Sequence, residues 1–169
     1  FSDDYTLGFR ILGLPFEEWL FFIIVPFCSI FIYENVKFFF KRFSYQDRMV
    51  KTLWSVAALY FLIAILGYDQ SYTFWNFLFN AVFLVFVLFN GWFRKHVTNF
   101  FIAFLVGTIP MLIVNGILTS FPVVLYNPGE FSNIRLFTIP VEDFFYYFLL
   151  LIMNLFFYEL QQRKPDFEN

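Results

Sequence analysis

The chain has 169 residues, of which 60% are hydrophobic, 27% aromatic and only 14% charged. A soluble domain typically contains about 45–50% apolar and about 25% charged residues, so this composition indicates a membrane protein. The net charge of -2 argues against a nucleic-acid partner, and the single cysteine, Cys28, excludes an intrachain disulfide and any cysteine-based metal or redox centre.

Five long uncharged windows follow one another along the chain, and each is long enough with its flanks to cross a hydrocarbon layer of ~30 Å. They predict an all-α fold, a polytopic membrane helix bundle with about five transmembrane helices. In chain order the expected helices cover about Phe16–Phe40, Lys51–Tyr68, Tyr72–Phe93, Val97–Ser120 and Pro140–Gln162.

The connections between these helices carry their own signals. The first fourteen residues are expected to form an approach loop, after which Pro15 suits the first turn of a helix. Pro110 lies between two glycines in the fourth helix and predicts a kink or a break there. The longest loop follows that helix, and Asn127-Pro128-Gly129 marks a turn in it.

The basic residues are distributed unevenly between the two sides of such a bundle. Nine of them lie on one side: Lys37, Lys41, Arg42, Arg48, Lys51, Arg94, Lys95, Arg163 and Lys164. Only Arg10 and Arg135 lie on the other side. Because basic loops stay in the cytoplasm, the sequence predicts a multi-pass protein of the cell membrane whose Arg10 side faces away from the cytoplasm.

The stretch Leu14–Phe22 recurs as Ile139–Tyr147, at an offset of 125 residues. Over the 34 positions from Phe1 to Glu34, the identical pairs are Arg10/Arg135, Pro15/Pro140, Glu17/Glu142, Phe31/Phe156, Tyr33/Tyr158 and Glu34/Glu159. Most of these are not the aliphatic residues that a membrane composition matches by chance, which indicates an internal repeat. Four crossings separate the two copies, so the repeat is expected to be parallel, which weighs against the inverted-repeat plan of many transporters.

The repeated stretch places adjacent acids at the start of two apolar helices. Carboxyls below the headgroups are costly and usually face the interior of a bundle. Burial and a close like charge both favour the protonated form, which a general acid needs. We therefore take Glu17, Glu18, Glu142 and Asp143 as the candidate catalytic residues and expect all four to face a shared apolar cavity near the non-cytoplasmic side. The alternative is that acids in a first turn only complement the helix dipole.

Aromatic residues surround these acids, and aromatic faces can stabilise a carbocation. The candidate substrate-lining residues are Trp19, Phe21, Phe22, Phe144, Tyr146, Tyr147 and, further along the same polar face of the last helix, Asn154. The alternatives are that phenylalanine fills lipid-facing positions and that the polar face serves helix packing.

Other polar residues have plainer interpretations. Glu34 is expected to pair with Lys37, and Glu159 with Arg163, at helical spacing. His96 is expected to be a solvated residue of a cytoplasmic turn. As the only histidine, it excludes histidine-box iron sites.

Three asparagines within the apolar segments, Asn76, Asn80 and Asn115, are expected to form hydrogen bonds between helices. The chain has no aspartate-rich pair for magnesium diphosphate, no glycine-rich dinucleotide fingerprint and no nucleophile elbow. No metal site and no cofactor are therefore predicted.

A family resemblance is carried by the run Arg10-x-x-x-Leu14-Pro15-x-Glu17-Glu18-x-x-Phe21-Phe22 and by its echo Arg135-x-x-x-Ile139-Pro140-x-Glu142-Asp143. With the Tyr-Glu that closes each copy, the chain resembles the heterodimer-type and fused lycopene (carotenoid) cyclases of bacteria, archaea and fungi. The likeness covers essentially the whole chain, and Asp143 in place of a second Glu is within the variation of that family.

The resemblance implies a domain plan in three parts. Residues 1–50 would be the end of a first cyclase-type repeat, 51–69 a joining helix, and 70–169 a second repeat of three helices. By this comparison two helices would precede Phe1, and the chain is expected to be a fragment of a longer protein. No cleaved signal peptide is expected, because no basic n-region and cleavage site stand at the start.

The resemblance also implies an activity, the redox-neutral isomerisation of lycopene ends to β-ionone-type rings. A carboxyl protonates the terminal double bond, the cation cyclises, and a base removes a proton. Glu17 and Glu142 would act as acid or base, with Glu18 and Asp143 as their partners. The expected partners are a linear carotenoid and membrane lipid, and the sequence is compatible with a homo- or hetero-oligomer.

Two other classes of protein fit the same acids. A proton-coupled membrane transporter would move its substrate with a pH gradient and leave carotenoids unchanged. In a non-catalytic membrane scaffold the acids would only hold helices together, and their loss would lower stability without a chemical effect.

Overall fold

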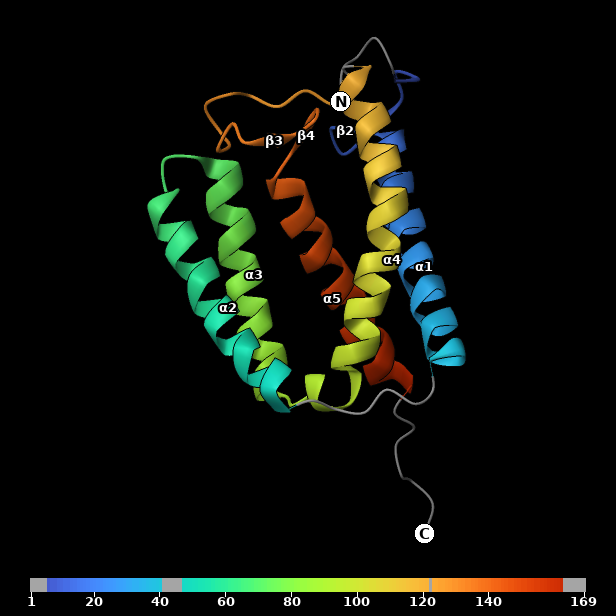
Figure 1. The fold of residues 1–169 in the computed structure, drawn as a ribbon. Helices are drawn as coiled ribbons and strands as arrows, with labels where there is room; N and C mark the ends of the chain where they lie inside the picture. Colours follow the sequence, from blue (N-terminus) through green and yellow to red (C-terminus); the bar gives the residue numbers. More distant parts are fainter. Residues whose placement is uncertain (1–5, 41–46, 122, 163–169) are drawn as a thin grey trace.

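A computed structural model describes residues 6–40, 47–121 and 123–162, which form five long helices and two small hairpins (Figure 1). The helices are α1 (Phe16–Phe39), α2 (Asp47–Leu66), α3 (Ser71–Phe89), α4 (Phe93–Ser120) and α5 (Glu142–Gln162). All five are long and apolar enough to cross a membrane. The predicted all-α membrane bundle is confirmed.

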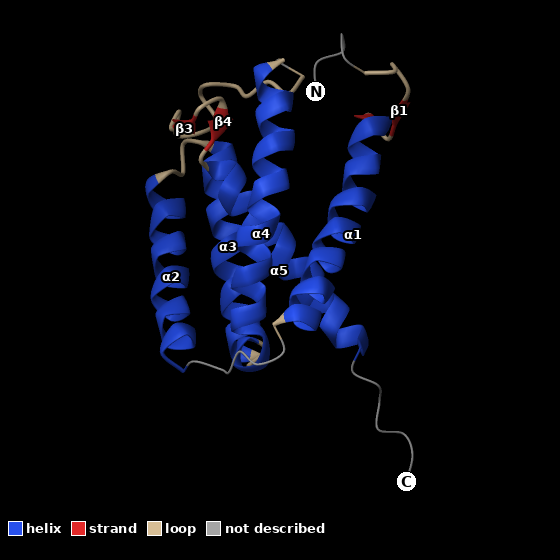
Figure 2. Ribbon diagram, turned by 45° about the vertical axis from the view of Figure 1, so that its right-hand side comes forward, coloured by secondary structure: helices blue, strands red, loops and turns tan. Residues whose placement is uncertain are grey.

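The last helix, α5, lies at the centre of the bundle (Figures 1 and 2). It packs against α3 on one side and against α1 and α4 on the other, while α2 packs mainly on α3. Leu84, Phe93, Phe100 and Leu155 are fully buried in this core. Large apolar side chains also cover the outer faces of the helices, as expected where the surrounding solvent is lipid.

The boundary between α3 and α4 lies about one turn earlier than the sequence suggested. The third helix ends at Phe89, and Gly91 follows it with a φ of 67°, a left-handed conformation that commonly closes a helix. Trp92 and Phe93 are 1% and 0% exposed, so they belong to the packed start of α4. The expectation that the third helix reaches Phe93 was wrong because the run of apolar residues continues through this turn and does not show where the helix ends.

The fourth helix runs unbroken through Pro110. Of the kink or break expected at this proline, the break is therefore not formed, and the kink remains a prediction. On the same helix, Gly107 is buried against α5, and a side chain at this position would overlap the Tyr147 hydroxyl. The absence of a side chain at Gly107 lets Tyr147 pack against α4.

Gly107→Ala is expected to lower the free energy of unfolding by about 1–3 kcal/mol, because an added methyl group overpacks this contact. Adding Tyr147→Phe should recover part of the loss, since the hydroxyl is the nearest atom to the new methyl group. Thermal unfolding in detergent measures both effects. Gly116→Ala is the control, because the nearest atom there is 3.9 Å away. Equal melting temperatures for the two alanine variants would contradict the prediction.

Each acidic motif is preceded by a small antiparallel hairpin. In the first, β1 (Arg10–Ile11) pairs with β2 (Leu14–Pro15), and in the second, β3 (Arg135–Leu136) pairs with β4 (Ile139–Pro140). The registers are identical at the offset of 125, because Arg10 pairs with Pro15 and Arg135 with Pro140. Both hairpins lie at the same end of the bundle (Figures 1 and 2), so the repeat is parallel.

The arginine of each hairpin closes its own turn. The Arg10 guanidinium donates a hydrogen bond to the carbonyl oxygen of Gly13 at 3.4 Å, and that of Arg135 donates to Thr138 at 2.7 Å. The turns also share an unusual backbone, since Leu12 and Phe137 have φ angles of 51° and 57°. The identities found in the sequence therefore correspond to one structural unit built twice.

Candidate active site

The first acid of each motif binds the backbone that precedes its hairpin. Oε1 of Glu17 accepts a hydrogen bond from the amide of Leu7 at 2.7 Å, and Oε1 of Glu142 accepts one from the amide of Ser132 at 2.8 Å. Leu7 and Ser132 are themselves repeat counterparts. A carboxylate that accepts such a bond fixes the loop against the first turn of the helix.

Glu142 is the more enclosed of these two acids. It is 0% exposed, and its Oε1 also accepts a hydrogen bond from Thr73 Oγ1 of α3 at 2.7 Å. The Oε2 atoms of Glu17 and Glu142 are both buried, and neither has a hydrogen-bond partner among the described residues.

The second acids, Glu18 and Asp143, meet at a cavity of about 180 Å³ near the hairpin end of the bundle. Its lining residues are Glu18, Phe21 and Phe22 of α1, Tyr72 of α3, Asn115 and Leu118 of α4, Val124 and Tyr126 of the following loop, and Asp143 and Tyr146 of α5. A shared cavity was expected for all four acids. It is lined by the second acid of each motif, whereas Glu17 and Glu142 do not line it.

Asp143 is 4% exposed and is surrounded by hydrogen-bond donors from three separate elements. The Tyr72 hydroxyl donates to Oδ1 at 2.7 Å, and the Tyr126 hydroxyl donates to Oδ2 at 2.7 Å. The side-chain amide of Asn115 donates to Oδ2 at 3.2 Å. Three such donors stabilise a negative charge on a carboxyl group.

Tyr126 belongs to the loop outside the membrane-spanning helices. Burial and the neighbouring Asp143 carboxylate raise the pKa of its phenol well above the usual range. The phenol therefore keeps its proton and acts as a hydrogen-bond donor. The loop is held over the cavity because the carbonyl oxygen of Glu130 accepts a hydrogen bond from the amide of Tyr72 at 2.8 Å.

Glu18 has a different environment from its counterpart. Within residues 6–40, 47–121 and 123–162, no hydrogen bond or ion pair joins its carboxyl group to another side chain. It lines the cavity beside Phe21 and Phe22 of its own helix, together with Tyr146 of α5. The two repeat-related acids are therefore unlike in their chemistry, although they are alike in sequence position.

Only some of the candidate substrate-lining residues line this cavity. Phe21, Phe22 and Tyr146 line the cavity, whereas Trp19 donates its indole N–H to the Ile11 carbonyl of the first hairpin at 3.1 Å. Tyr147 is stacked on Phe104 of α4 with 5.4 Å between ring centroids.

Phe144 and Asn154 are half-buried on α5 and do not line the cavity either. The amide nitrogen of Asn154 is buried and has no partner in the part of the chain that the structure describes.

Two asparagines hold the start of α5 against α3. The Asn76 amide donates to the carbonyl oxygen of Glu142 at 2.7 Å, and the Asn80 amide donates to that of Phe145 at 3.0 Å. Asn80 also donates to the side chain of Asn76 at 2.9 Å. The expected interhelical role of both residues, and that of Asn115, is confirmed.

Sequence reasoning missed Tyr72 and Tyr126 as parts of the site. Tyr72 stands in the first turn of α3, and Tyr126 lies in a loop. Their partner Asp143 is 71 and 17 residues away, respectively. The available signal was a pair of phenols on the same side of the membrane as the acids, but no local spacing links them to Asp143.

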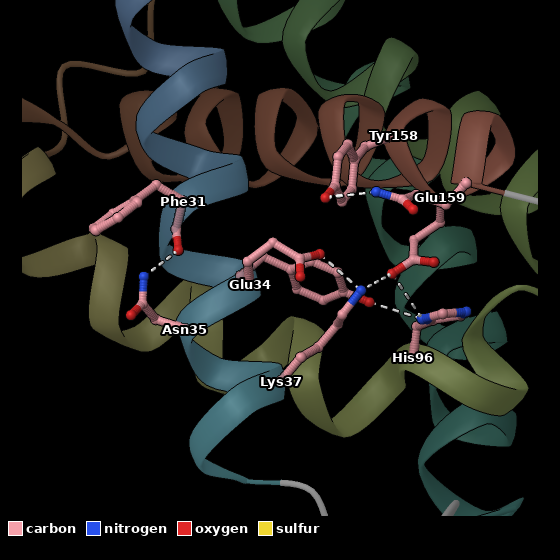
Figure 3. A network of polar contacts seen from close by, with 9 residues as sticks. Phe31, Glu34, Asn35, Lys37, His96, Tyr158 and Glu159 are labelled. Atoms are coloured by element: carbon pink, nitrogen blue, oxygen red, sulfur yellow. Dashed lines mark hydrogen bonds and ion pairs between the residues drawn. The ribbon is translucent and has the colours of Figure 1, made fainter.

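A second polar cluster, the lysine cluster, lies at the opposite end of α1 and α5 (Figure 3). Lys37 Nζ lies 2.7 Å from Oε1 of Glu34 and 2.8 Å from Oε1 of Glu159. The predicted pair of Glu34 with Lys37 is confirmed. The predicted partner of Glu159, Arg163, lies outside the described residues, and Glu159 binds Lys37 of another helix instead.

His96 joins the lysine cluster and is not a solvated surface residue. Its Nδ1 is hydrogen-bonded to the Tyr33 hydroxyl at 2.7 Å and lies 3.7 Å from Oε1 of Glu159. Its ring stacks on Trp92 at 4.9 Å with an interplanar angle of 12°. The surface expectation was wrong because the basic residues next to His96 suggested a turn, whereas α4 has already begun at this point.

A larger hollow of about 490 Å³ lies between the end of α4 and the tip of the second hairpin. Its lining is apolar apart from Ser120 and Thr138, and it contains no acid. Among the described residues, no group of three or more histidine, cysteine or carboxylate side chains could hold a metal ion. The smaller cavity with its two acids is therefore the candidate active site.

Comparison with known families gives an independent result. The family model described as lycopene cyclase matches residues 1–36 and 69–161. The unmatched interval contains α2, the helix expected to join two repeats, but the division into 1–50, 51–69 and 70–169 remains a prediction. No curated protein and no solved structure matches the chain. Because the family model covers most of its length, the chain belongs to the lycopene cyclase family.

Proposed function

We propose that this protein converts the linear ends of lycopene into β-ionone-type rings in the cell membrane, by proton transfer between two carboxyl groups. The proposal is carried by one observation: Glu18 of α1 and Asp143 of α5 face one cavity with aromatic walls. A cavity of about 180 Å³ accommodates one end of a carotenoid, and the rest of the polyene extends towards the lipid.

Glu18 is the proton donor in this proposal. Its carboxyl group lines the cavity and has no hydrogen-bond or ion-pair partner among the described residues, so it is available to the substrate. A neutral carboxyl group at this cavity can transfer its proton to the terminal double bond of the carotenoid. The positive charge then forms on the tertiary carbon of that bond.

Ring closure follows without a further proton transfer. The next double bond attacks the cation, a carbon–carbon bond forms, and the charge moves to a tertiary ring carbon. The rings of Phe21, Phe22 and Tyr146 line the cavity, and aromatic faces stabilise a cation there.

Asp143 is the proton acceptor. Its three hydrogen-bond donors hold the carboxyl group at the cavity wall, and it removes a proton from a carbon next to the cation to form the ring double bond. One proton is gained and one is lost, so the product is an isomer of the substrate. Asp143 then releases its proton to solvent and Glu18 takes up a proton from solvent, which completes the cycle.

The test uses membranes from cells that express the protein, supplied with lycopene in D₂O buffer. We expect cyclic carotenoids that carry a single additional deuterium per ring, because the incoming proton comes from an exchangeable carboxyl group. Lycopene recovered unchanged would refute the proposal. A pH-driven flux in sealed vesicles without cyclic product would indicate the transporter instead.

A further inference from the structure

Asp143 is held in place from three directions. Tyr72 of α3 binds one carboxylate oxygen, while Asn115 of α4 and Tyr126 of the loop bind the other, all at 2.7–3.2 Å. Because the donors come from separate elements, the carboxylate cannot rotate or shift without losing at least one of these bonds. Glu18 on the other wall of the cavity has no comparable set of donors in the described part of the chain.

The position of the base matters for the last step of a cyclisation. The cationic ring carbon has three neighbours that carry hydrogen: the ring carbon that bears the polyene, a ring methylene and a methyl group. Removal of a proton from each neighbour gives a different ring isomer. Since proton transfer requires the base within hydrogen-bond reach, the carbon that lies nearest the carboxylate is the one that loses its proton.

We propose that Tyr72 and Tyr126 are positioning residues that determine which ring isomer forms. They fix the Asp143 carboxylate opposite one of the three carbons. In the step itself a carbon–hydrogen bond breaks, its electron pair becomes the new double bond and neutralises the cation, and the proton moves to Asp143. The step needs no oxidant. The inference rests on the proposed function and adds the origin of its product specificity.

The two tyrosines are not equivalent. Without the Tyr126 hydroxyl, Asn115 still donates to the same oxygen, Oδ2. Without the Tyr72 hydroxyl, Oδ1 has no remaining side-chain donor among the described residues. Tyr72→Phe should therefore release the carboxylate more than Tyr126→Phe does.

The experiment expresses the full chain with Tyr72→Phe, with Tyr126→Phe and with both changes in lycopene-accumulating cells, and separates the ring isomers by chromatography. For Tyr72→Phe we expect the ratio of minor to main isomers to rise on the order of tenfold, the effect of losing one hydrogen bond to a charged group. The rise should be smaller for Tyr126→Phe and largest for the double variant, and rings should still form.

Tyr60→Phe is the matched control, because this phenol is also buried but packs among Phe77, Phe145 and Phe148 away from the cavity. An unchanged isomer ratio in the double variant, with rings still formed, would overturn the positioning role and leave the cyclase proposal intact. Absence of rings from the unaltered chain would refute the proposed function itself. If Tyr72→Phe does not fold, the same ratio measured for Tyr126→Phe decides the question.

Discussion

Glu18→Gln is expected to reduce ring formation on the order of 10²–10⁴-fold while the protein remains folded, because a positioned general acid contributes about that much to a rate. The carboxyl group of Glu18 forms no hydrogen bond with the described residues, so its replacement by an amide removes a transferable proton and no structural contact. The measurement is the yield of cyclic carotenoid per folded protein, with folding followed by thermal unfolding in detergent.

The exposed Asp69→Asn provides the control, because it removes a carboxylate from the loop before α3 without touching the cavity. Ring formation by Glu18→Gln at the level of this control would remove Glu18 from the mechanism. Asp143→Asn should also abolish ring formation, but it should lower the melting temperature too, since an amide presents a donor to groups that already donate.

Substitution of the first acid of each motif should lower stability, unlike substitution of Glu18. Glu142→Gln is expected to cost about 1–3 kcal/mol of stability, because the amide cannot satisfy the buried site as the carboxylate does. Its activity should fall together with its stability, as should that of Glu17→Gln. If these two variants lost activity at unchanged stability, Glu17 and Glu142 would be the acid and base instead.

Lys37→Met is expected to destabilise the bundle by about 2 kcal/mol, somewhat less than the ~3–5 kcal/mol typical when one partner of a fully buried ion pair is removed. The lysine is 31% exposed and neutralises two carboxylates, of which Glu159 is only 12% exposed. Without it, the acids of α1 and α5 would repel each other across the helix interface. The expected fall in melting temperature is about 4–8 °C.

Two variants serve as controls for the lysine cluster. Lys37→Arg keeps the positive charge and should retain most of the stability. Lys51→Met removes an exposed lysine from the start of α2 and should have little effect. Equal melting temperatures for Lys37→Met and Lys51→Met would show that the cluster does not hold α1 to α5.

Much of this architecture could be predicted from the sequence, because its determinants are local or periodic. Long uncharged windows define spanning helices, and Pro15 and Pro140 mark where the motif helices begin. The offset of 125 residues, with the alternation of basic loops, places both motifs at one end. Hydrophobicity and chain length are sufficient for each of these inferences.

The sequence could not show which acids line the cavity and which bind the preceding loop. Glu17 and Glu18 are consecutive in one helical turn and point about 100° apart, so the rotation of the helix about its axis decides which one faces the cavity. That rotation is set by the hydrogen bond of Glu17 to the Leu7 amide, which precedes the hairpin, and by the packing of α1 on α4 and α5. Similarly, His96 meets Tyr33 across 63 residues of sequence, and pairs so remote leave no periodic trace.

The cavity between Glu18 and Asp143 has a consequence for products with two rings. Lycopene is symmetrical and carries two identical ends, but in the described part of the chain Glu18 and Asp143 together line one chamber of about 180 Å³. Under the proposed function, one copy of the protein then closes one end during each residence of the substrate. The carotenoid with one ring must dissociate, reverse its orientation in the bilayer and bind again through its linear end. Single-ringed carotenoid is then an obligatory free intermediate, and its share of the product depends on how often it is recaptured before it diffuses away.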